Sequence, residues 1–149
     1  MRRMTKTEFQ QEIEAQFLAP MMGDKAPIQS VCAEDEWYII RPAKWYLRTP
    51  WFGFPKFTYA GCALDCDDLA KIQEVYWIER NWKQLAPSGP GSGAAPALPV
   101  IRVKYVHPEL GMHWSNLALT AEGWLCLDRM PDGTIQRRAL PSIPYKLDF

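Results

Sequence analysis

Hydrophobic and polar positions alternate most regularly in two stretches of the chain, residues 99–106 and 116–128. In the first, valine, isoleucine and tyrosine alternate with basic residues, which is the period of a half-buried β-strand. In the second, leucines alternate with alanine and threonine up to Glu122 and Gly123, a turn signal, because glycine accepts positive φ at little cost. An apolar run then ends at Asp128. The sequence therefore predicts a strand over 99–106 and two strands joined by a turn within 116–128.

The N-terminal region has the period of an α-helix. Over residues 8–18, apolar side chains recur at every fourth position among glutamines and glutamates. Thr5 or Thr7 can cap this helix, and proline and glycine follow it. We expect an amphipathic helix that packs on a sheet. Its apolar positions are Phe9, Ile13 and Phe17.

A second, longer helix is predicted over residues 65–83. Asp65 or Asp67 can cap it, and acidic residues lie in its first turn, where the helix dipole favours them. Apolar residues occupy a broad stripe of this helix. We therefore expect it to be largely buried or covered by a partner.

Three short segments rich in aromatic and β-branched residues predict strands at 37–41, 45–48 and 56–59. Because they are short and closely spaced, they are typical of an antiparallel meander. Residues 86–99 are dominated by glycine, proline, serine and alanine, and they predict a flexible loop that cannot bury enough apolar surface to offset its entropy. The residues beyond this loop would form a thin core alone, so we expect one domain over 1–149.

The composition excludes several classes of protein. Hydrophobic residues make up 48% and charged residues 23%, as in an ordinary globular domain. The 17 basic residues equal the 17 acidic ones, which argues against a dedicated nucleic-acid binder. The sequence has no apolar run of membrane-spanning length and no signal-peptide pattern, so we expect a cytoplasmic protein with reduced thiols. The cysteines lack the paired spacing of a zinc site, and we expect no metal; they are Cys32, Cys62, Cys66 and Cys126.

The segment from Gly123 to Asp128 reads Gly-Trp-Leu-Cys-Leu-Asp. It resembles the active-site segment of ubiquitin-conjugating enzymes, in which Gly-x-Ile/Leu-Cys-Leu-Asp follows a short turn. It looks most like the stand-alone conjugating-enzyme-like proteins of bacterial antiphage (CBASS) operons, which often lack the family's His-Pro-Asn triplet. The resemblance implies an α+β fold, with an N-terminal helix on an antiparallel β-meander. Here that fold would carry an inserted helix at 65–83 and a truncated C-terminal half.

The resemblance also implies a mechanism and a partner. Cys126 would be the nucleophile that accepts the C-terminal carboxyl group of a carrier protein as a thioester, which a lysine amine then attacks. Residues 107–115 would form a loop near this thiol, and His113, Asn116 and Asp128 would orient the acceptor or stabilise an oxyanion. The implied partner is a cGAS-like cyclic-oligonucleotide synthase in antiphage defence, with no cofactor.

The residues themselves leave other interpretations open. Free cysteine often behaves as a small buried hydrophobe, so Cys126 can be a plain core residue. The domain would then be a non-catalytic module that binds a partner through its aromatic side chains, or an unrelated interaction protein such as a toxin-neutralising immunity protein. An accessible Cys126 favours the enzyme. A sheet in which residues 99–106 and 116–128 are not neighbours favours the immunity protein.

Overall fold

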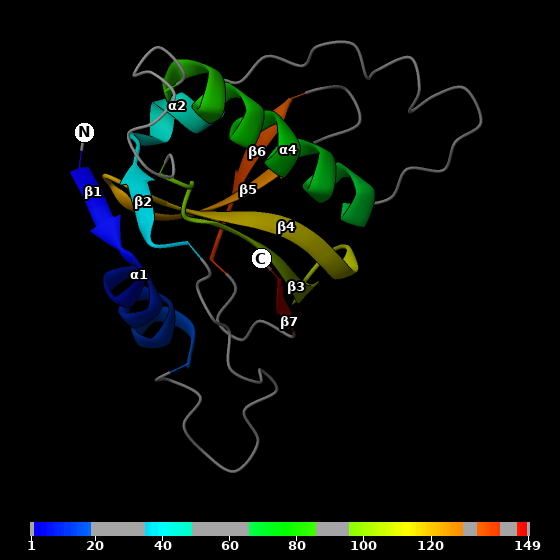
Figure 1. Ribbon diagram of the computed structural model, residues 1–149. Helices are drawn as coiled ribbons and strands as arrows, with labels where there is room; N and C mark the ends of the chain where they lie inside the picture. The colour runs from blue at the N-terminus through cyan, green and yellow to red at the C-terminus, as the bar shows by residue number, and fades with distance from the viewer. Residues whose placement is uncertain are drawn as a thin grey trace.

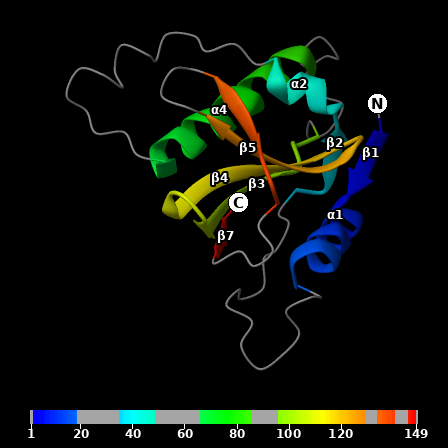
Figure 2. The ribbon, with the colours of Figure 1, turned by 180° about the vertical axis from the view of Figure 1, so that it is seen from behind.

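The computed structural model describes residues 2–18, 35–48, 66–85, 96–129, 134–140 and 146–148. Within these ranges the chain is α+β, with two antiparallel sheets and helices packed on the larger one (Figures 1 and 2). The larger sheet has the strand order β6-β5-β4-β3-β7. Its strands are β3 (Val100–His107), β4 (Gly111–Thr120), β5 (Gly123–Arg129), β6 (Ile135–Arg138) and β7 (Lys146–Asp148).

Strand β4 lies in the middle of this sheet and is joined to β3 and β5 by tight turns. The first residues of β4 and β5, Gly111 and Gly123, have φ of +73° and +103°, a conformation that strains any residue with a Cβ. The register places Ile101 of β3 and Cys126 of β5 on either side of Leu117. Because successive side chains alternate between the faces, these three residues point to the same side of the sheet.

The N-terminal unit begins with a strand and continues as a helix. The Thr5 hydroxyl accepts a hydrogen bond from the backbone N–H of Glu8, and the Glu8 carboxylate accepts one from the N–H of Thr5, which forms a capping box. The apolar stripe of the predicted helix is buried, which confirms the prediction for this segment. The elements are β1 (Arg2–Thr5), its antiparallel partner β2 (Trp37–Ile40), α1 (Lys6–Ile13) and a π-helical segment (Glu14–Leu18).

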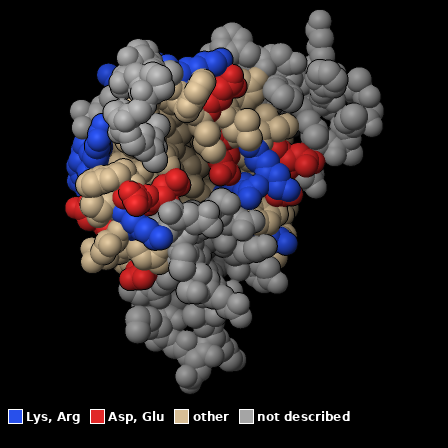
Figure 3. Space-filling model, in the orientation of Figure 1, with Lys and Arg blue, Asp and Glu red and all other residues tan. Residues whose placement is uncertain are grey.

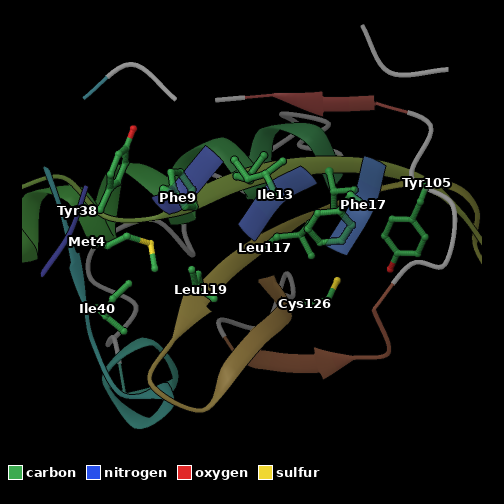
Figure 4. Packing of buried hydrophobic residues seen from close by; sticks show 12 residues of the cluster. Met4, Phe9, Ile13, Phe17, Tyr38, Ile40, Tyr105, Leu117, Leu119 and Cys126 are labelled. Atoms are coloured by element: carbon green, nitrogen blue, oxygen red, sulfur yellow. The ribbon is translucent and has the colours of Figure 1, made fainter. Parts of the chain in front are cut away.

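Two hydrophobic cores cover the two faces of the large sheet. The first lies between α1 and the face that carries Leu117 (Figure 4). Stacked and edge-on contacts of Phe9 and Phe17 with Trp124 attach the helix to β5, with ring centroids 6.1 and 5.2 Å apart. The second core lies on the opposite face, where Ala118 and Leu127 pack with residues of two further helices.

The first of these helices, α2 (Ala43–Leu47), corrects the predicted strand at 45–48. Trp45 and Tyr46 favour a strand by intrinsic propensity, but Pro42 starts a helical turn whose C=O accepts from the N–H of Trp45 at 2.9 Å. In this helix Tyr46 reaches full burial and meets Trp77 edge-on at 5.2 Å. Tertiary packing of two large rings therefore overrides the local preference.

Helix α4 (Cys66–Leu85) confirms the second predicted helix. Trp77 is its central anchor, since its side chain is fully buried and its indole N–H donates to the backbone C=O of Tyr46. Part of the apolar stripe instead faces solvent, because Val75, Ile78 and Trp82 are 50 to 62% exposed. The prediction of a largely buried helix therefore holds for one side of α4 only.

Other predicted boundaries also change. Residues 96–99 belong to the fold, since Ala97 pairs with β2 through two backbone hydrogen bonds, so the predicted loop 86–99 is wrong over its last four residues. Residues 107–115 are mostly strand, with a turn only at 108–110. The predicted strand at 56–59 lies outside the described residues. None of the helices in the described ranges is long and apolar enough to cross a membrane.

Replacing Trp77 with alanine tests the anchor of α4. Because the indole is fully buried, we expect Trp77→Ala to lower the free energy of unfolding by about 3–5 kcal/mol. Trp82→Ala is the matched control in the same helix. Its side chain is 62% exposed, so the change should stay within about 0.5 kcal/mol. Urea denaturation followed by circular dichroism measures both, and equal losses would contradict the described packing.

Candidate functional site

A buried His–Asp pair lies on the face of the sheet that also carries Cys126. The register that pairs Asn116 with Leu127 places Ser115 of β4 opposite Asp128 of β5. His113 Nε2 lies 2.7 Å from Asp128 Oδ2, and the Ser115 hydroxyl donates to Asp128 Oδ1 at 2.9 Å. Strand pairing thus brings His113 and Asp128, two residues predicted from the sequence, into direct contact.

Arg138 of β6 completes the surroundings of Asp128. Its Nε donates to Asp128 Oδ2 at 2.5 Å, and its guanidinium also lies 3.1 Å from Nε2 of His107. Burial disfavours the charged carboxylate, but the hydrogen bonds from His113, Arg138 and Ser115 outweigh it and lower the pKa of Asp128. Asp128 is therefore a carboxylate held in place by three donors.

The Asp128 contact fixes the orientation of the His113 ring. With Nε2 directed at the carboxylate, Nδ1 makes no hydrogen bond to any residue of the described ranges. The His113 side chain is 11% exposed, so the ring retains a small accessible edge. The rings of Tyr105 and His107 lie 5.9 and 5.8 Å away and limit its movement. A carboxylate that orients an imidazole with one free nitrogen is the arrangement of a general base.

Cys126 lies on the same face, but its thiol is enclosed. Only 1% of the residue is exposed, and it packs in the core between the sheet and α1, at the same end of the cluster as Tyr105 (Figure 4). Burial raises the pKa of Cys126 to about 11, although the neighbouring Ser115 hydroxyl opposes this shift. An attacking thiol must be reachable and readily ionised, and Cys126 meets neither condition. We therefore do not assign the nucleophile to this residue.

Asn116 points to the opposite face. Its side chain is fully buried, and its Nδ2 donates to the backbone C=O of Ala70 in α4 at 3.1 Å. The period of two in β4 separates it from His113, three positions earlier. Asn116 thus fixes α4 on the sheet and does not join the His–Asp pair. The sequence prediction grouped it with His113 because it took residues 107–115 as a loop.

Cys66 is a cysteine that the sequence reasoning missed as a candidate. It is the first residue of α4 and is partly exposed. Ala70 contacts Asn116, while Trp77, about two turns later, packs in the cluster of Ala118. The helix therefore starts near the His113 end of β4 (Figure 1). The signal in the sequence was a cysteine in the first turn of the helix predicted over residues 65–83.

The described residues contain no group of three or more His, Cys, Asp or Glu side chains that could hold a metal ion. Cys32 and Cys62 lie outside the described residues. The site that the structure does describe consists of the His113–Asp128 pair with Ser115 and Arg138, an arrangement from which proton transfer can be built.

Comparison with known proteins adds evidence on the fold. No family model matches the chain, and no curated protein matches it. A solved structure, the PSL1a-E64 complex, is similar to it with a TM-score of 0.56 and 16% sequence identity. The match covers 99% of this chain and 50% of that one, so this chain spans half the length of the solved protein. At this identity the likeness concerns the fold alone.

Asp128→Asn tests the electrostatics of the pair. Because the pKa of Asp128 is lowered in the folded protein, its contribution to stability is present above about pH 4, the unfolded value. It is lost as the pH falls through the folded-state pKa. We expect Asp128→Asn to reduce the free energy of unfolding by about 3 kcal/mol at pH 7, and less at lower pH.

Urea denaturation at a series of pH values measures this difference between the variant and the wild type. Glu109→Gln is the control, since Glu109 is an exposed carboxylate in the turn between β3 and β4. Its stability should follow that of the wild type at every pH. A loss in Asp128→Asn that is the same at pH 7 and pH 3 would contradict a stabilising carboxylate.

Proposed function

We propose that this protein is a cysteine-dependent acyl-transfer enzyme in which His113 is the general base and Asp128 orients it. The observation that carries the proposal is the 2.7 Å contact between His113 Nε2 and Asp128, because Nδ1 then has no hydrogen-bond partner among the described residues and can accept a proton. An acid–base pair of this geometry serves a nucleophile in covalent catalysis. Its burial keeps water from competing for the carboxylate.

Cys66 is the nucleophile of this proposal. It is the partly exposed one of the two cysteines in the described ranges, and it starts a helix that begins near the His113 end of β4. Because α4 and His113 lie on opposite faces of the sheet, this role requires the Cys66 side chain to reach His113 around the end of the sheet.

The steps follow from these roles. His113 Nδ1 takes the proton of the Cys66 thiol, and the thiolate attacks the carbonyl carbon of an ester or amide substrate. The bond from that carbon to the leaving oxygen or nitrogen breaks, and His113 returns the proton to the leaving group. The product is a thioester on Cys66. A water molecule or an amine then attacks the thioester, with His113 again accepting the proton.

The last step separates two versions of the proposal. Attack by water makes the protein a hydrolase. Attack by a lysine amine makes it a conjugating enzyme, as the sequence resemblance implies, with the C-terminus of a cGAS-like synthase as the carried group. The neighbouring positions of residues 99–106 and 116–128 in the sheet suit this version and do not fit the arrangement expected of an immunity protein. In the resemblance to ubiquitin-conjugating enzymes, the reacting thiol is that of Cys126. In this structure that thiol is buried and would first have to become exposed.

Labelling with iodoacetamide, a reagent that alkylates cysteine thiols, tests the proposal. We expect peptide mapping by mass spectrometry to find Cys66 labelled faster than the other cysteines, both in the wild type and in Cys126→Ser. His113→Gln should slow the labelling of Cys66 by about a hundredfold or more, because the base is lost.

The remaining outcomes distinguish the alternatives. Labelling that disappears in Cys126→Ser and persists in Cys66→Ser would return the nucleophile to Cys126. A host-protein adduct that reductant removes from the wild type but not from Cys66→Ser would identify the conjugating version and its carrier. Thiols that react no faster than free cysteine, with no effect of His113→Gln, would contradict enzymatic chemistry and favour a partner-binding module.

A further inference from the structure

A groove of about 330 Å³ runs beside the C-terminal half of α4, away from Cys66. One wall is the outer side of this helix, and the other is formed by residues at and before the start of β2 and by residues 96–100. Figure 3 shows this face of the molecule with a hollow that has acidic atoms beside it. The apolar residues that line the groove include Tyr38, Ile78, Trp82, Ala97, Leu98 and Val100.

Two large apolar side chains at this groove are exposed to solvent. Ile78 is 50% exposed and Trp82 is 62% exposed, and the two are four residues apart, so they lie one above the other on the same side of α4. Leu98 and Val100 beneath them are buried and form an apolar floor. An exposed tryptophan at the rim of an apolar groove is a frequent anchor of protein interfaces.

The polar groups of the groove are mostly satisfied within the chain. The Asn81 amide accepts from Nε of Arg41 and donates to the backbone C=O of Pro96, so it has little capacity left to orient a polar small molecule. Such ligands usually need several convergent polar groups, which the described lining does not supply. The apolar surface therefore fits a segment of another protein better.

The charge of the groove lining indicates which type of segment would bind there. The charged residues that line the groove in the described ranges are Asp35 and Glu74, with no lysine or arginine among them. Glu74 is partly neutralised by Arg102, whose Nε lies 3.3 Å from its carboxylate, whereas Asp35 is exposed. The face of the Trp82 indole offers a further site for a cation. Both features favour a positively charged ligand.

We propose that this groove binds a short segment of a partner protein that places a large apolar side chain beside a lysine or arginine. The apolar side chain would lie between Trp82 and Leu98, and the cation would lie near Asp35. The proposal does not depend on the chemistry of Cys66, because the groove and that thiol lie toward opposite ends of α4.

Selection from a random heptapeptide library displayed on phage tests this proposal with the full-length protein. We expect enriched peptides that combine a basic residue with a neighbouring Leu, Phe or Trp. Fluorescence anisotropy of the most enriched peptide should give an affinity that falls at least about fivefold in Trp82→Ala. Asp35→Asn should weaken binding by about twofold to fivefold and reduce its dependence on salt.

The controls separate the groove from other exposed surfaces. Val106→Ala removes an apolar side chain that is 66% exposed on the β3–β4 hairpin, and Glu109→Gln removes a nearby charge. Neither should change the affinity. Circular dichroism of Trp82→Ala verifies its fold.

Three results would overturn the proposal: no enrichment over selection without protein, enriched peptides without basic residues, or equal binding to wild type and Trp82→Ala. Sedimentation of the wild type as a dimer that Trp82→Ala dissociates would instead assign the groove to a second copy of the chain.

Discussion

The packing of both faces of β4 is the constraint on which the rest of this structure depends. Leu117 and Leu119 face the core under α1, whereas Asn116 and Ala118 face α4. A shift of one residue in the strand register would exchange these faces and place a polar amide among the aromatic rings. Glycines at the starts of β4 and β5 hold the turns that set this register. The alternation therefore determines which helix lies on which side.

The same alternation explains where the polar groups lie. His113 and Asp128 continue, toward the hairpin end of the sheet, the rows that begin with Leu117 and Cys126. The core under α1 thus gives way to a hydrogen-bonded network in which Asp128 receives three donors. Buried polar groups of this kind require complete pairing, and they hold an imidazole more rigidly than a loop would. This rigidity makes the pair suitable for acid–base chemistry.

Helix α4 separates two possible activities in space. It begins with a thiol at one end of the sheet and carries an apolar rim above the groove toward its other end. Its buried side combines Trp77 with Gln73 and Asn81, and these amides bind arginines of the sheet and of the segment after β2. Such specific contacts fix the helix in one orientation. A partner bound in the groove would consequently lie at a defined position relative to the thiol.

The sequence by itself determined the local elements with strong periodicity. The N-terminal helix with a threonine cap, the turn at Gly123 and the strand after Pro99 follow from interactions between residues close together in the sequence, which a single segment contains. It also indicated His113 and Asp128, though as accessories of a cysteine between them. A short motif around Cys126 led to the prediction that this thiol reacts. A motif carries no information about burial, so the sequence could not show that the thiol is enclosed.

Only the tertiary structure decided the rest. It made residues 43–47 helical, since the burial of Tyr46 against Trp77 outweighs the strand propensity of its rings. It enclosed Cys126 beneath α1 and turned Asn116 toward α4. It paired His113 with Asp128, fifteen residues apart, through the register of two strands. Burial and strand register are properties of contacts between distant segments, so the pattern within one segment cannot specify them.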